Sequence, residues 1–148
     1  MHKMVASIRV PPSYAGVQNP PETTIEICND TGSNIQSVHR GDLQAIGADP
    51  ANPQFTIPTN RVDVKLAQGQ STTSMLLRIQ MRLLAVQGAQ LAPLTEWFQV
   101  DAVLDDTGGL RLSGHEMRHY LYFATAKGNS ELYVGQTKTA LQKRLPAV

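Results

Sequence analysis

A turn-forming tetrapeptide, Asp30-Thr31-Gly32-Ser33, follows a segment with the alternation of a β-strand. A carboxylate held rigidly at such a turn can share a proton with a second carboxylate that faces it. Because two carboxylates so close do not both ionise easily, one becomes the base that activates water and the other acts as an acid toward a carbonyl group. Taken alone, these residue types are those of an ordinary turn, so the surrounding elements have to decide between the two interpretations.

The same tripeptide recurs at Asp106-Thr107-Gly108. Two copies would suit a chain with two lobes, each contributing one aspartate, but too few residues follow Gly108 to build a second lobe. We therefore interpret the segment from Asp105 to Gly109 as a turn. If Asp30 is catalytic, the second carboxylate has to come from another chain, which predicts a homodimer with twofold symmetry.

A third motif, His115-Glu116-Met117-Arg118-His119, has the letters of a zinc-peptidase helix. On a helix, histidines four residues apart share a face and bind zinc, with the glutamate as general base. Arg118 puts a cation inside the motif, however, and Glu131 is the only carboxylate downstream. We predict a short solvated helical turn and no metal site, with a zinc peptidase as the less favoured alternative.

A fourth pattern, Tyr120-Leu121-Tyr122 followed by Tyr133-Val134-Gly135-Gln136-Thr137 and Arg144, resembles the opening of GIY-YIG nucleases. Those enzymes need a catalytic glutamate well downstream, whereas this sequence ends at Val148. The segment instead predicts two β-strands with their tyrosines on a half-buried face. We expect no nucleic-acid partner, because the composition offers no basic groove.

The bulk composition is that of one globular domain. The chain has 148 residues, of which 41% are hydrophobic and 17% charged, with a formal net charge of +1. These values favour a folded chain with a single core over a disordered chain. They show no excess of positive charge of the kind that binds nucleic acid. The single cysteine, Cys28, rules out an intrachain disulfide, and no apolar run approaches the length of a membrane span. We expect a soluble intracellular, cytoplasmic protein with no membrane partner.

Glycine and proline divide the chain into short segments, which predicts an all-β barrel or sandwich. The clearest alternation runs from Met75 to Val86, where apolar residues alternate with arginine and glutamine. Together with Val62–Leu66 it predicts a hairpin whose tip is Ala67-Gln68-Gly69-Gln70. The other predicted strands are Val5–Val10, Thr23–Cys28, Trp97–Leu104, Tyr120–Thr125 and Glu131–Val134. Short helical turns are expected around Leu43 and at His115–Tyr120, and a loop from Gly47 to Pro58.

This order of elements resembles the retropepsins, the protease family of retroviruses and retrotransposons. The shared order is a strand, Asp-Thr-Gly-Ser, a short strand, a long loop, a hairpin with glycine at its tip, a strand, and a closing motif matched by Leu110-Arg111-Leu112-Ser113-Gly114. The resemblance covers about residues 5–121. It implies one retropepsin-like domain over residues 1–148, with a C-terminal extension from about residue 122. That domain would be an all-β acid-protease barrel with a flap hairpin and one short helix, assembled as a homodimer.

The resemblance also assigns roles to residues. It makes Asp30, Thr31 and Gly32 catalytic, places Ser33, Gln68, Gly69 and Gln70 against a peptide or protein substrate, and threads the closing motif behind the catalytic loop. It implies an aspartic endopeptidase without metal or organic cofactor. One residue departs from the family, because Asn29 stands where an apolar residue usually precedes the aspartate. That departure leaves open a non-catalytic module for dimerisation or peptide binding.

Overall fold

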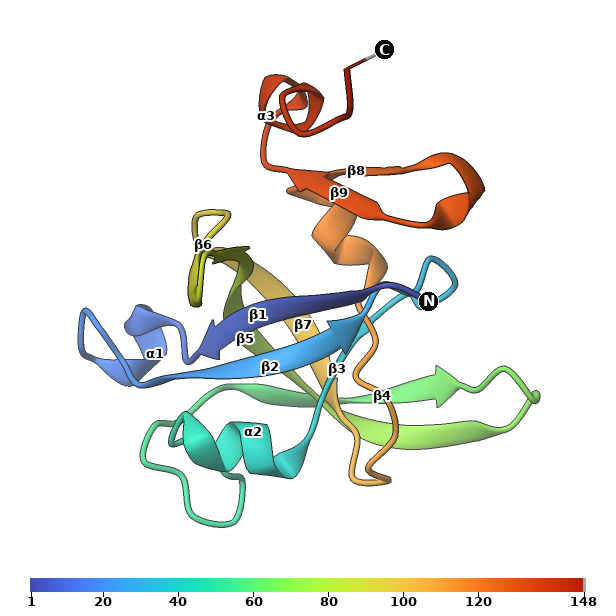
Figure 1. Cartoon of the computed structure of the whole chain (residues 1–148). Coiled ribbons are helices and arrows are strands. Elements are labelled where there is room, and N and C mark those ends of the chain that lie inside the picture. Colours follow the sequence, from blue (N-terminus) through green and yellow to red (C-terminus); the bar gives the residue numbers. More distant parts are fainter. Residues whose placement is uncertain (148) are drawn as a thin grey trace.

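The computed structural model describes residues 1–147 and is mostly β-structure, which confirms the all-β prediction (Figure 1). The longest of the described helices, α2, has six residues. The strands are β1 (Lys3–Arg9), β2 (Glu22–Cys28), β3 (Gln36–Val38), β4 (Thr59–Lys65), β5 (Ser71–Gln87), β6 (Gln90–Pro93), β7 (Phe98–Leu104), β8 (Tyr122–Thr125) and β9 (Leu132–Gly135). The helices are α1 (Pro12–Ala15), α2 (Arg40–Ala45) and α3 (Lys138–Gln142), with 3₁₀ turns η1 (His115–His119) and η2 (Lys127–Asn129).

The long strand β5 organises the main sheet. Its N-terminal part pairs with β4 and β7, and its C-terminal part pairs with β1 and β6. The strand order β2-β1-β5-β7-β3 leaves β2 and β3 at the two ends of an open path. No closed barrel is found among the described residues, because Cys28, at the end of β2, makes its bridge to Leu112 in an irregular segment rather than to β3.

The hydrophobic core is built from the buried residues of β1, β2, β5 and β7 together with α2. The alternation predicted in β5 is confirmed, since Leu77, Ile79, Met81 and Leu83 are buried while Arg78 is exposed. Successive side chains of a strand point to opposite faces, so the buried set forms one continuous face with apolar residues of β1 and β2. Helix α2 lies below β2 in Figure 1, on the side away from β8–β9, and its leucine joins the core.

The hairpin β8–β9 forms a second, smaller sheet at the C-terminal end of the chain (Figure 1). Helix α3 packs closely on it: a Cβ atom at Gly135 would lie 2.5 Å from the Leu141 backbone nitrogen. Val134 and Leu121 belong to the same core as the main sheet, and Phe123 packs against it. The C-terminal extension is thus attached to the rest of the chain through apolar contacts. None of the described helices is long and apolar enough to cross a membrane.

Candidate active site

The loop that joins β2 to β3 carries Asp30. The chain leaves β2 at Cys28 and turns at Thr31 and Gly32. One carboxylate oxygen of Asp30, Oδ1, accepts a hydrogen bond of 2.9 Å from the Gly32 backbone N–H, and Ser33 Oγ donates to the Ile35 carbonyl oxygen at 2.8 Å. Asp30 is half-buried, whereas Thr31 and Gly32 are exposed. The Asp30 carboxylate is therefore held by a hydrogen bond within its own loop, and the tip of the loop is exposed.

The closing segment, residues 110–114, lies directly behind this loop. The Cys28 N–H donates to the Arg111 carbonyl at 2.7 Å, and the Ser113 N–H donates back to the Cys28 carbonyl at 2.9 Å. On the other side, the Ser37 N–H donates to the Leu112 carbonyl at 3.1 Å, and the Leu112 N–H donates to Ser37 Oγ at 2.8 Å. The segment thus runs between the end of β2 and β3 and joins the two ends of the open sheet.

Ser113 provides a direct contact with the candidate catalytic residue. The residue is 2% exposed, and its hydroxyl oxygen accepts a 3.1 Å hydrogen bond from the Asp30 backbone N–H. A buried N–H without a partner would be costly, so this bond stabilises the position of the Asp30 main chain. The neighbouring Gly114 admits no side chain, because a Cβ atom there would lie 2.4 Å from the Gln36 backbone nitrogen.

A partly buried ion pair secures the same segment to α2. Arg111 donates two hydrogen bonds to the Asp42 carboxylate, at 2.7 and 2.8 Å. Asp42 is buried and also accepts from the His39 N–H at 2.8 Å. The hydrogen bond to Asp42 raises the pKa of the Arg111 guanidinium above its ordinary value, against the opposing effect of burial. The paired charges are therefore compensated, which is the condition for burying them.

The polar residue before Asp30 has a specific partner. Arg118 Nη2 donates to Asn29 Oδ1 at 3.0 Å, and the same guanidinium lies over the Phe123 ring, 4.7 Å from its centroid. The resemblance places the closing motif behind the loop, but the sequence does not predict the individual partners of Arg118, Ser113 and Arg111. Those partners lie far away along the chain.

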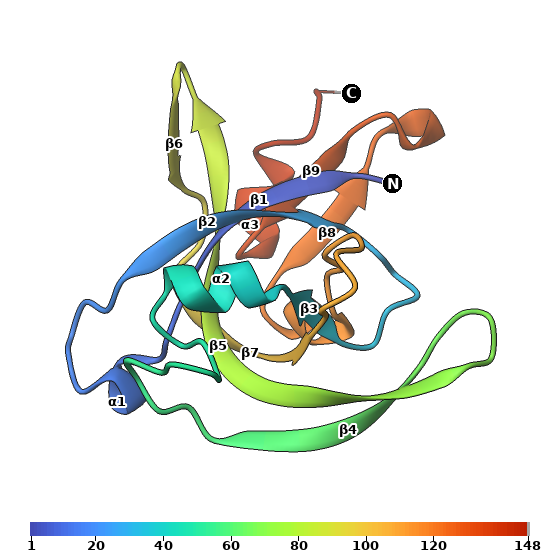
Figure 2. The same cartoon turned by 90° about the horizontal axis from the view of Figure 1, so that it is seen from below.

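The hairpin predicted from the sequence is present as β4–β5, with its tip at the expected residues. The Leu66 N–H donates to the Gln70 carbonyl at 2.8 Å, and the Gly69 N–H donates to the Leu66 carbonyl at 2.9 Å. Gly69 has φ of +81°, which favours glycine. Gln68, Gly69 and Gln70 are exposed. Figures 1 and 2 both show this tip on the same side of the molecule as the loop between β2 and β3.

The second Asp-Thr-Gly copy forms a bend outside this site. Asp106 accepts a 2.8 Å hydrogen bond from Arg40, while the Asp105 carboxylate caps the backbone N–H of Thr107 at 2.8 Å. These contacts are those of a surface turn, so the structure does not bring Asp106 into a pair with Asp30.

The His-Glu-x-x-His segment forms the 3₁₀ turn η1, with both histidines exposed. Their rings lie edge to face, with centroids 6.0 Å apart. Glu116 is engaged elsewhere, since its Oε2 accepts from the Asp101 backbone N–H at 2.7 Å. Among residues 1–147, no group of three His, Cys, Asp or Glu side chains could hold a metal ion.

The two strands predicted around the tyrosine motif are present as β8 and β9, and they pair antiparallel. The expected half-buried face is found for Tyr133, whose hydroxyl donates to the Glu131 carboxylate. It is wrong for Tyr120 and Tyr122, which are exposed. The alternation of β8 instead turns Phe123 toward the core.

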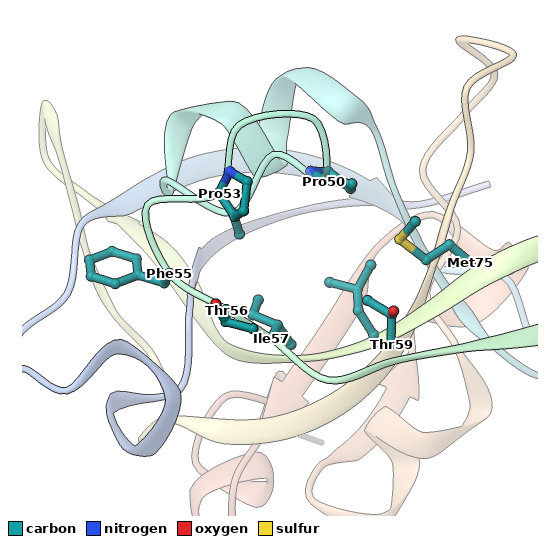
Figure 3. Close-up of a pocket in the computed structure, with 9 residues that line it drawn as sticks. Pro50, Pro53, Phe55, Thr56, Ile57, Thr59 and Met75 are labelled. Carbon is teal, nitrogen blue, oxygen red and sulfur yellow. The ribbon is translucent and has the colours of Figure 1, made fainter.

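An apolar cavity of about 260 Å³ lies between the loop after α2 and the base of the hairpin β4–β5 (Figure 3). Pro50, Pro53 and Phe55 line it from the loop, and Met75 and Leu77 line it from β5. None of its lining residues belongs to the Asp30 loop or the closing segment, so this cavity is separate from the candidate site.

Comparison of the chain with known protein families, curated proteins and solved structures gives no match.

Proposed function

We propose that this chain is one subunit of a homodimeric aspartic endopeptidase of the retropepsin type, with Asp30 as its catalytic carboxylate. The observation that carries the proposal is the support of the Asp30 loop by the closing segment. Ser113 accepts from the Asp30 N–H, and the segment runs between β2 and β3 behind it. This arrangement fixes the main chain of an aspartate whose loop tip is exposed, as a pair of facing carboxylates requires.

The chemistry needs a second carboxylate, for which Asp30 of the partner subunit is the candidate. Asp106, the other aspartate in an Asp-Thr-Gly context, is bound to Arg40. Two aspartates in contact share one proton, since their like charges oppose ionisation of both. The ionised member removes a proton from a water molecule as that water attacks the scissile carbonyl. The protonated member donates its proton to the developing oxyanion.

The substrate of such a site is an extended peptide. The hairpin β4–β5 has exposed residues at its tip on the side of the Asp30 loop, where it can close over a bound chain (Figure 2). Closure excludes water, and main-chain hydrogen bonds add the peptide to the flap as a further strand. In this assignment Ser33, Gln68, Gly69 and Gln70 contact the substrate.

The first test is cleavage of a mixed peptide library between about pH 4 and 7 by the wild type and by Asp30→Asn. We expect cleavage by the wild type, with a bell-shaped pH profile, because the pair works only with one proton bound. Asp30→Asn removes the group that ionises and should abolish cleavage while the variant stays folded. Mass spectrometry of the products and circular dichroism provide the two measurements.

A metal chelator supplies the matched control for the alternative chemistry. Cleavage that persists in Asp30→Asn, or that is lost only on chelation, would contradict the proposal and point to His115 and His119. A wild type that binds peptides without cleaving them would instead identify the non-catalytic module, for which the polar Asn29 before Asp30 is the supporting feature.

A further inference from the structure

We infer that the C-terminal hairpin β8–β9 positions the Asp30 loop by holding Asn29 through two separate lines of contact. The inference rests on the proposed function and gives a role to the extension beyond residue 121. Asn29 immediately precedes Asp30, so whatever fixes its main chain and its side chain also restricts the carboxylate that follows.

The first line of contact reaches the Asn29 side chain. Arg118 Nη2 donates to Asn29 Oδ1 at 3.0 Å. The guanidinium is in turn placed by Phe123 of β8, whose ring centroid is 4.7 Å away. A cation over an aromatic face is attracted to it, and Phe123 is itself packed against the core. The hairpin therefore orients the arginine that binds Asn29.

The second line reaches the Asn29 main chain. Its N–H donates to the His2 carbonyl oxygen at 2.7 Å. The imidazole of His2 is within 3.0 Å of Asn129 Oδ1, measured from Nε2. Asn129 lies in the turn that joins β8 to β9 and has φ of +57°, a left-handed conformation that asparagine tolerates. The turn of the hairpin thus contacts His2, whose carbonyl oxygen accepts the hydrogen bond from the Asn29 N–H.

The two lines meet on one residue beside the proposed catalytic group. With Ser113 bound to the Asp30 N–H, consecutive residues of the loop are fixed from the hairpin and from the closing segment. Arg118 is accordingly a positioning residue that acts through Asn29. Without the hydrogen bond from Arg118, the Asp30 carboxylate should depart from the geometry of the pair. This change should lower the rate of the chemical step more than it weakens substrate binding.

The experiment compares Arg118→Met with Arg118→Lys, using Arg144→Met as control. Methionine keeps an unbranched apolar side chain but cannot donate, lysine restores a donor, and Arg144 is an exposed arginine beyond α3. We expect kcat of Arg118→Met to fall about tenfold with little change in KM. Arg118→Lys should recover part of the loss, and the control should match the wild type.

Hydrogen exchange gives a readout that does not depend on cleavage. In Arg118→Met the amides of Asp30 and Gly32 should exchange faster, while core amides of β1 and β5 keep their protection. Unchanged exchange at Asp30 and Gly32 would overturn the inference, as would a kcat equal to that of the wild type. If the wild type cleaves no peptide, the proposed function fails, and the exchange rates alone decide whether the hairpin positions the loop.

Discussion

Gly114 is the residue at which the candidate site tolerates the least change. A Cβ atom there would meet the main chain of β3 and of the residue before it, at 2.4 Å from the Gln36 nitrogen and 2.7 Å from the Ile35 carbonyl carbon. Since these are backbone atoms, no side-chain rotation relieves the overlap. We expect Gly114→Ala to lower the free energy of unfolding by about 3 kcal/mol, the upper part of the usual range for overpacking. Urea denaturation followed by circular dichroism measures it.

Gly41 provides the matched control for this substitution. It lies in α2, and a Cβ atom built there has no neighbour within 4 Å. Because alanine favours a helix over glycine by about 1 kcal/mol, Gly41→Ala should leave stability unchanged or raise it. Equal effects of the two substitutions would mean that the backbone contact at Gly114 is unimportant for stability.

At this scale the sequence identifies residue types but not their partners. Asp30 and its turn are recognisable because strand alternation ends just before them. The bond between Arg118 and Asn29 joins residues 89 positions apart, and Arg118 lies inside a motif whose letters favour zinc binding instead. The resemblance places the closing motif behind the catalytic loop, but it does not identify Ser113 as the residue that accepts from the Asp30 N–H. Such contacts depend on how distant segments thread, which local patterns do not encode.

At the scale of elements, the loop after α2 depends on an ionised carboxylate. The hydrogen bond from the Ala51 backbone N–H, followed by that from the Gln44 side chain, lowers the pKa of Asp49 below its ordinary value of 3.8. A group with a lowered pKa in the folded state contributes stability above its unfolded pKa and loses that contribution as the pH falls through the folded value. Asp49 therefore stabilises the fold at neutral pH and ceases to do so in acid.

The corresponding prediction uses Asp49→Asn, which keeps a side-chain acceptor but removes the charge. We expect the variant to unfold more easily than the wild type at pH 7, with the difference shrinking as the pH falls below about 4. Thermal unfolding at a series of pH values measures the difference. Asp63→Asn, at an exposed aspartate of β4, is the control; a pH-independent difference for Asp49→Asn would contradict the assignment.

Strands could be predicted from the sequence where apolar and polar residues alternate over a long enough stretch to show which face of the strand is buried. Strand β5 shows this best, because four apolar residues alternate with polar ones and all four are buried. Strand β3 has only three residues, all buried, and it pairs parallel with the distant β7. With neither alternation nor a nearby partner, its extent could not be derived from the sequence. Helices α1 and α3 are likewise too short to show a helical period.

In the molecule as a whole, the N-terminal segment and the hairpin β8–β9 come together near the candidate site. His2 and the hairpin β8–β9 both approach the loop that carries Asp30, and Figure 1 shows the N-terminus between that hairpin and the main sheet. The sequence indicates an extension beyond residue 121 but not its position. Its attachment depends on scattered core residues such as Val134 and Phe123, each of which would suit any packed strand.

Association of two chains is the property on which the proposed chemistry depends, since each chain brings a single Asp30. If the partner stabilises the folded chain, the midpoint of thermal unfolding should rise with protein concentration. A tenfold increase in protein concentration adds about 1.4 kcal/mol to the free energy of separating and unfolding the dimer. Sedimentation equilibrium on the same samples measures the mass. Asp30→Asn should associate at least as tightly at neutral pH, since it removes the repulsion between two carboxylates brought into contact. A wild type that cleaves peptides as a monomer, with a midpoint independent of concentration, would require a second catalytic group within one chain and would remove the reason for the dimer.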